Sequence, residues 1–283
     1  MKEKERDPLT IPNESMVREG PDIRYILQKR SKDHTQEIFD LVSKELNSTI
    51  YGEHAYFLNW GYIANENPEY SQIELPKYCL HKNSVKLILE LVGGCNLTGC
   101  NVLDIGCGRG GTIYVINKYF PVRRLIGLDL SGEAIAFCNK TLSSWKRQFI
   151  QGDAEHLPFP DGSFDIITNV ESSGSYPDIK AFYGEVYRVL SSGYFLYTDL
   201  FRVKEVDMKL TLLQNTGLIL ERNQDITSNV LLSCDEVSRK TLAAFKKSGN
   251  DFVAGFLGTP GSTLYNDMKE GELTYRILRL RKP

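Results

Sequence analysis

The chain lacks the features that mark metal-binding or disulfide-built proteins. Its 283 residues include only four histidines and two tryptophans, and its six cysteines form no C-x-x-C pair. Structural zinc sites use such pairs together with suitably spaced histidines, so we expect no metal site. The irregular cysteine spacing instead favours reduced thiols, and with them a cytoplasmic location.

Long apolar runs and an excess of one charge are also missing. No stretch approaches the roughly 20 apolar residues that span a bilayer, and the charged start, MKEKERD, lacks the apolar core of a signal peptide. A net charge of −2 and a pI near 6.1 do not favour a nucleic-acid surface. The hydrophobic fraction of 41% is that of an ordinary globular protein.

Glycine, by contrast, is concentrated in one run, VLDIGCGRGG at residues 102–111. An apolar strand, a glycine turn and a helix start bring bare backbone N–H groups to a ligand. Gly106, Gly108 and Gly111 match the dinucleotide fingerprint. Asp104 would repel a pyrophosphate but attract an ammonium group. The run therefore favours a nucleoside that ends in a cation, as S-adenosylmethionine does.

Acidic residues follow two further expected strands. Asp129 comes after the glycine turn at the spacing of a carboxylate that accepts ribose hydroxyls. Asp153 follows the next strand, where it can face an adenine amino group. An N-cap or a solvated turn would explain either acid alone. Together with Asp104, they indicate a nucleoside site.

Residues 101–200 resemble a class I S-adenosylmethionine-dependent methyltransferase. The matching segments are 104–110, 127–129, 152–159 and 163–165. A narrower likeness, in 57–62, in 169–173 and in the tail from Pro260 to Tyr275, is to methyltransferases of natural products such as polyketides, phenolic lipids and sugars. The resemblance covers about residues 50–283.

The resemblance implies a cofactor site for S-adenosyl-L-methionine. The first acid and the glycines would hold the methionine end, the second acid the ribose, and the Asp153–Ala154 pair the adenine. An aromatic segment before the first core strand would pack around the sulfonium, although core packing is an alternative for it. The implied cofactor-binding residues are Tyr56, Asn59, Trp60, Asp104, Gly106, Gly108, Asp129, Leu130, Asp153, Ala154 and Asn169.

The alternation of apolar strands and amphipathic helices predicts an α/β fold. We expect a Rossmann-like, doubly wound, seven-stranded and mostly parallel sheet with a helical N-terminal lid. The last two strands should pair like a hairpin, and the pattern of 273–280 changes phase, which predicts a bulge or an end near Ile277. Expected strands are 101–105, 124–128, 147–151, 164–169, 194–199, 218–220 and 273–280; expected helices are 34–46, 82–92, 112–119, 132–145 and 178–190.

We divide the chain into an arm and helical lid, 1–98, and a methyltransferase core, 99–283. Two helical insertions, near 203–217 and 234–256, extend the core. The lid would close over the carboxyl ends of the strands, where doubly wound sheets bind ligands. Simple covering of the sheet is the alternative for the N-terminal helices.

Three residues are candidates for acid–base chemistry. Glu171 and Asp199 end neighbouring strands, where two carboxylates raise each other's pKa; a turn cap is the alternative for Asp199. Members of the resembling subgroup often have a histidine three residues after the glutamate, but this chain has Gly174. We therefore also consider His54, supplied by the lid, as the base.

The leading interpretation is a methyltransferase that O-methylates a hydroxyl of a small or carrier-bound natural product such as a polyketide. C- or N-methylation is the nearest alternative, because Gly174 removes the usual base. A cofactor-binding protein without turnover is another, and a dehydrogenase is the weakest because of Asp104. Expected partners are a small-molecule or carrier-protein-bound substrate, without nucleic acid; a homodimer stays open.

Overall fold

The computed structural model describes residues 31–48, 52–64, 67–245 and 258–283. The expected N-terminal arm, 1–30, and the last part of the second insertion, 246–256, lie outside these residues. Within this part of the chain no helix is both long and apolar enough to cross a bilayer.

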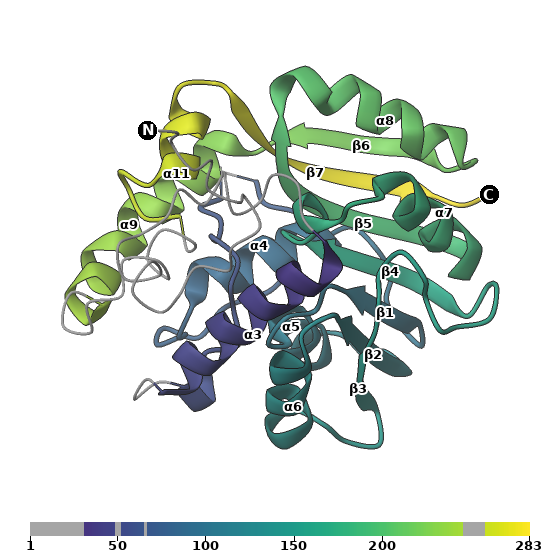
Figure 1. Ribbon diagram of the computed structural model, residues 1–283, viewed down its shortest axis with the longest axis horizontal. Helices are drawn as coiled ribbons and strands as arrows, with labels where there is room; N and C mark the ends of the chain where they lie inside the picture. Colours follow the sequence, from purple (N-terminus) through teal and green to yellow (C-terminus); the bar gives the residue numbers. More distant parts are fainter. Residues whose placement is uncertain (1–30, 49–51, 65–66, 246–257) are drawn as a thin grey trace, which may run out of the picture.

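The core is a seven-stranded sheet in the order β3-β2-β1-β4-β5-β7-β6 (Figure 1). All neighbours pair in parallel except β7, which is antiparallel to both β5 and β6. The order reverses between β1 and β4, so the chain winds outward in two directions, as the sequence predicted. The strands are β1 Asn101–Ile105, β2 Arg124–Asp129, β3 Arg147–Gln151, β4 Phe164–Val170, β5 Leu190–Arg202, β6 Ile219–Asp225 and β7 Leu273–Arg281.

Helices cover both faces of the sheet. Side chains of α4, α5 and α6 belong to the core on one face, and those of α7 and α8 to the core on the other. The helix α3, purple in Figure 1, packs against α6. The described helices are α3 Lys32–Ser48, η1 Gly52–His54, α4 Lys82–Val92, α5 Gly111–Tyr119, α6 Gly132–Thr141, η2 Ser173–Ser175, α7 Ile179–Val189, η3 Val203–Glu205, α8 Val206–Asn215, α9 Thr227–Phe245 and α11 Thr263–Lys269.

Local sequence signals explain where the core helices begin. Ser131 caps α6 by accepting a hydrogen bond from the backbone N–H of Ala134, and Asp178 caps α7 in the same way. The start of α5 instead follows Gly110, whose φ of 80° is left-handed. The glycine turn thus leads straight into the α5 N-terminus, as expected for a loop that faces a ligand.

Two local expectations were wrong. No bulge or end occurs in β7 near Ile277; β7 runs on to Arg281, and the register shift lies in β6, between Leu220 and Arg222. The apolar pattern of β7 changes phase because both faces of this inner strand are covered. The strand β5 also starts at Leu190, not 194, because Gly193 lets the backbone pass against Asp165.

Candidate active site

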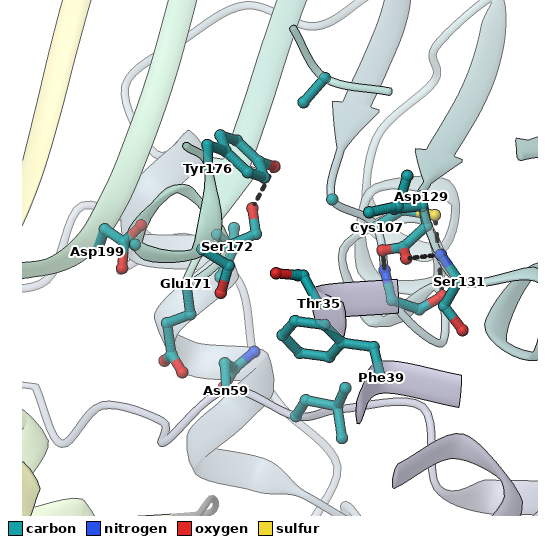
Figure 2. A pocket seen from close by; sticks show the side chains of 18 of the residues that line it. Thr35, Phe39, Asn59, Cys107, Asp129, Ser131, Glu171, Ser172, Tyr176 and Asp199 are labelled. Carbon is teal, nitrogen blue, oxygen red and sulfur yellow. Dashed lines mark hydrogen bonds between the residues drawn. The ribbon is translucent and has the colours of Figure 1, made fainter. Parts of the chain in front are cut away.

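A cavity of about 300 Å³ lies at the carboxyl ends of the strands, beside the point where the strand order reverses. Doubly wound sheets bind ligands at this position, and the volume is at the small end of the range for ligand pockets. Its walls come from the glycine turn, the ends of β2, β4 and β5, the segment 56–60 and the helix α3. Figure 2 shows this cavity from close by.

The glycine turn keeps the floor of the cavity open. Gly106 has a φ of 68°, and a Cβ there would lie 2.3 Å from the Ser172 Oγ. Gly108 has a φ of 50°, and its backbone N–H donates to the Asp129 Oδ2 at 2.7 Å. Both glycines line the cavity, so bare backbone borders the ligand space, as predicted.

Asp129 stands at the end of β2 on the cavity wall, next to Leu130. Its Oδ1 accepts from the backbone N–H of Ser131 at 2.9 Å (Figure 2). Burial raises the pKa of Asp129, while these backbone donors oppose that change. Each oxygen keeps a lone pair for a further donor, such as a ribose hydroxyl.

Asp104 lies behind the glycine turn rather than on the cavity wall. It is 1% exposed, and its Oδ1 accepts from the Thr168 hydroxyl at 2.7 Å. Burial raises its pKa to about 7, and the charge of Asp129 adds to this. Its Oδ2 is buried without a hydrogen-bond partner among the described residues. The nearby Thr112 side chain, like that of Thr168, acts to lower the pKa of Asp104, while Oδ2 is left for a further donor.

Asp153 and Ala154 line the cavity where the sequence placed the adenine. Lys32, at the start of α3, lies 2.5 Å from the Asp153 Oδ2 and 2.5 Å from the Glu155 Oε2. The lysine lowers the pKa of Asp153 against the opposing effect of burial. The first turn of α3 is thus tied to the loop that follows β3.

The helix α3 contributes cavity residues that the sequence analysis missed. Lys32, Thr35, Phe39 and Ser43 line the cavity and follow the three- and four-residue spacing of one helix face. Thr35 is 6% exposed, and its Oγ1 has no partner in the described part of the chain. Figure 2 shows Thr35 and Phe39 between the Glu171 side and the Asp129 side of the cavity. The spacing of these four residues was a signal for a second functional face of α3. The sequence analysis considered only the apolar face that contains Val42 and Leu46.

Arg109 fastens this helix to the glycine turn. It is 1% exposed, and its guanidinium lies 3.6 Å from the centre of the Phe137 ring. Burial lowers its pKa to about 10. The guanidinium donates to the carbonyls of Ala55, Ser43 and Gly52 and to the Asn47 Oδ1, at 2.7 to 3.2 Å.

Tyr56, Asn59 and Trp60 all reach the cavity. The Tyr56 ring stacks on Tyr114 with centroids 5.2 Å apart. The backbone N–H of Trp60 donates to the Glu171 Oε1 at 2.9 Å. The aromatic segment therefore reaches both the ligand space and the predicted base.

Glu171 follows β4 directly, on the cavity wall. The Tyr275 hydroxyl donates to its Oε1, the same oxygen that accepts from Trp60. Burial raises the pKa of Glu171 to about 8; the two donors lower it, and the charge of Asp199 raises it. A carboxyl group with a pKa near neutrality is suited to proton transfer.

Asp199 also lines the cavity, and both of its carboxylate oxygens accept hydrogen bonds from the protein. Its Oδ2 accepts from the Ser173 backbone N–H at 2.9 Å and from the Ser173 hydroxyl at 2.6 Å. Its Oδ1 accepts from the backbone N–H of Leu200 at 2.8 Å. Asp199 lies inside β5 rather than at its end, and it holds the turn after β4, not the turn that follows its own strand as the sequence analysis left open.

Three predicted site residues do not line the cavity: Asp104, described above, His54 and Asn169. His54 is exposed in η1 and is not among the residues that line it, so the geometry gives no support to His54 as a base. Asn169 is fully buried behind the wall, where its Nδ2 donates to the Ser172 Oγ at 2.7 Å. It can therefore hold a wall residue, which differs from the predicted direct contact. Gly174 does line the cavity.

The fold and the cavity define a class: a doubly wound protein whose glycine turn, orphaned acid and strand-end carboxylates fit a cationic nucleoside. The protein-family model described as a methyltransferase domain matches residues 103–198 of this chain. A fatty-acid O-methyltransferase of Mycolicibacterium smegmatis is 30% identical over 257 residues, covering 88% of this chain and 91% of the relative. A phthiotriol/phenolphthiotriol dimycocerosates methyltransferase of Mycobacterium tuberculosis is 33% identical over 233 residues, covering 78% and 83%. The chain belongs to the S-adenosylmethionine-dependent methyltransferases, and S-adenosylmethionine is its cofactor.

Solved structures show the same fold at low identity. The cyclase SpnF superimposes with a TM-score of 0.70 at 20% identity, covering 90% of this chain and 97% of its own. A geranyl diphosphate C-methyltransferase from Streptomyces coelicolor A3(2) gives a TM-score of 0.63 at 16% identity, covering 87% and 98%. These likenesses confirm the predicted fold class.

Proposed function

We propose that this methyltransferase acts on a hydroxyl oxygen of an apolar small or carrier-bound natural product, with Glu171 as the base. One observation carries the proposal: the half-buried carboxyl group of Glu171 lies on the cavity wall with one oxygen that no described residue engages. Both protein donors go to the Glu171 Oε1, and no described residue donates to Oε2. Oε2 can therefore accept the proton of an acceptor hydroxyl.

The cofactor supplies a methyl group on a positively charged sulfur. Asp129 would hold its ribose, Asp153 its adenine end, and the glycine turn its methionine end. An acceptor oxygen that bonded this methyl carbon would leave the electrons of the broken C–S bond on the sulfur of the cofactor. The Glu171 Oε2 takes the hydroxyl proton. The protein's remaining task is to align these atoms and exclude water.

Apolar residues from β5, α11 and β7 in the cavity lining support an apolar acceptor. Leu200, Leu264 and Leu273 line the cavity, together with Arg202 and Lys209. A chain of methylene groups would bury favourably against the leucines. The names of two curated relatives, which refer to fatty acids and to dimycocerosates, point the same way.

Gly174 supports a competing acceptor chemistry. It lines the cavity where related enzymes often carry a histidine, and a Cβ there would meet no described atom within 4 Å. Packing therefore leaves room for a Cβ at position 174. An amine or an enolate needs less help from a base, so N- or C-methylation is the alternative reaction, and cofactor binding without turnover is the other.

The test compares wild type with Glu171→Gln on three acceptor types: a 3-hydroxy fatty ester, a long-chain amine and a long-chain fatty acid. We expect methyl transfer to the hydroxyl, and a fall in turnover of about 10²–10⁴ in the variant. Calorimetry should show unchanged affinity for S-adenosylhomocysteine. Full activity of Glu171→Gln, or transfer to the amine or fatty acid alone, would contradict the proposal.

The proposal includes the cellular compartment in which the enzyme works. All six cysteines are free, which supports a reducing compartment such as the cytoplasm. Delivery of the acceptor on a carrier protein, a homodimer and the division of the chain near residue 98 stay predictions.

A further inference from the structure

We infer that Tyr275 is a positioning residue, whose hydroxyl holds the Glu171 Oε1 so that Oε2 faces the acceptor. The inference rests on the proposed role of Glu171 as the base. Tyr275 lies on β7 and is not among the residues that line the cavity. It therefore acts through Glu171 rather than on the substrate.

Tyr275 approaches Glu171 from across the sheet. Tyr275 pairs with Leu200 of β5, and β5 in turn separates β7 from β4, the strand that Glu171 follows. The tyrosine is 0% exposed, and its hydroxyl makes a short hydrogen bond to the Glu171 Oε1. The reach of a long aromatic side chain thus joins the antiparallel end of the sheet to the active site.

The second donor to the same oxygen comes from a third part of the chain. The backbone N–H of Trp60 lies 2.9 Å from the Glu171 Oε1. Two donors at one oxygen fix the carboxyl plane and leave the lone pairs of the other oxygen for the acceptor. A side chain held in this way loses little entropy when the reaction begins.

The backbone of Glu171 is held as well. Its φ of 51° is in the left-handed region, which costs energy for a residue with a side chain. Its N–H donates to the Thr198 carbonyl at 2.9 Å, so the strained turn is tied to β5. Strain of this kind persists only where the surroundings over-determine the conformation, and Tyr275 is part of those surroundings.

Several charged or titratable groups surround this carboxyl group. Asp199 of β5 and the Cys234 thiol of α9 act on it electrostatically, and Lys209 of α8 acts on Asp199. Among the hydrogen bonds of the described residues, Tyr275 is the one side-chain hydroxyl that donates to Glu171. Removing it should destabilise the charged form of Glu171.

The test measures the titration of Glu171 in the full-length protein with bound S-adenosylhomocysteine. Difference infrared spectra against Glu171→Gln isolate the Glu171 carboxyl band as the pH is changed. In Tyr275→Phe we expect the pKa of Glu171 to rise by about one to two pH units, because one charge-assisted donor is lost. The acid limb of the turnover profile should move upward with it.

Tyr183→Phe is the matched control. Tyr183 is also 0% exposed, and its hydroxyl makes one long contact, 3.5 Å, to the Tyr197 hydroxyl. This variant should leave the Glu171 titration in place. An unchanged titration in folded Tyr275→Phe would overturn the inference.

A second probe covers the case in which Tyr275→Phe does not fold. Incorporation of 3-fluorotyrosine at position 275 keeps the shape and makes the hydroxyl a stronger donor, so the pKa of Glu171 should fall. No change would overturn the positioning role. Failure of the base itself looks different: Glu171→Gln would then stay fully active, whatever the titration in the Tyr275 variants.

Discussion

At the residue scale, the strand-end acids differ in what the protein leaves for a ligand. The Asp199 carboxylate accepts from the Ser173 N–H, the Ser173 hydroxyl and the Leu200 N–H. The Asp129 carboxylate accepts one backbone N–H at each oxygen. Asp104 keeps a buried oxygen with no partner among the described residues. These differences show that Asp199 holds the cavity wall, whereas contact of Asp129 and Asp104 with the cofactor stays a prediction.

Substitution of Asp129 by alanine should weaken S-adenosylhomocysteine binding at least about tenfold, because hydrogen bonds to a charged group contribute roughly 1.5–3 kcal/mol each. Titration calorimetry measures this. Asp161→Ala is the control, since the Asp161 side chain is 81% exposed and pairs with Arg188 away from the cavity. Equal affinity of folded Asp129→Ala and wild type would rule out the ribose role.

At the element scale, α3 connects the separate parts of the cofactor site. Its first turn binds the loop after β3 through Lys32, and its Asp40 accepts from the Ser131 hydroxyl at 2.5 Å. The Ser43 carbonyl near its end accepts from Arg109 of the glycine turn. These contacts place α3 along the cavity, whereas closure of residues 31–98 as a lid stays a prediction.

Replacing Arg109 by methionine should detach α3 from the core. The change leaves three buried carbonyls without their donor, each worth about 1–3 kcal/mol when unsatisfied. We expect faster proteolysis within residues 31–56, which mass spectrometry of the fragments measures. We also expect weaker S-adenosylhomocysteine binding, which calorimetry measures.

Arg124→Met is the control for the loss of an arginine. Arg124 is exposed, and its guanidinium donates to the Gln148 side chain on the neighbouring strand. Wild-type protection of residues 31–56 in Arg109→Met would show that packing alone holds α3.

At the scale of the whole molecule, buried acids give the fold a characteristic pH dependence. Burial raises the pKa of Asp104 to about 7 and that of Glu171 to about 8, and it also raises the pKa of Asp129 and of Asp199. In the unfolded chain such groups titrate near pH 4. The folded protein therefore binds more protons than the unfolded chain between about pH 4 and pH 8.

The free energy of unfolding should accordingly fall as the pH rises through this window. The slope approaches about 1.4 kcal/mol per pH unit for each fully raised acid. Urea unfolding of the cofactor-free protein at several pH values measures it, and Glu171→Gln should flatten the slope. A stability that rises with pH over the window would contradict the burial of these acids.

The sequence by itself determined the seven strands and the helices between them, and two of its three predicted cofactor acids, Asp129 and Asp153, line the cavity. Hydrophobic periodicity and glycine position are local properties, so β1 and the turn at Gly106 were predicted correctly. Local sequence patterns mispredicted β5 and β7. The start of β5 depends on the close approach of Gly193 to Asp165 on the neighbouring strand. The pattern of β7 depends on burial of both of its faces.

Only the tertiary structure decided which side chains meet. From the sequence, Tyr275 is predicted to be a core residue of the last strand. The order of strands in the sheet brings it to Glu171, which is 104 residues away in sequence. Thr35 and Arg109 gain their roles from the packing of α3 across the glycine turn, and His54 is left outside the cavity. Local patterns predict elements because they depend on neighbouring residues, whereas a site depends on contacts between distant elements.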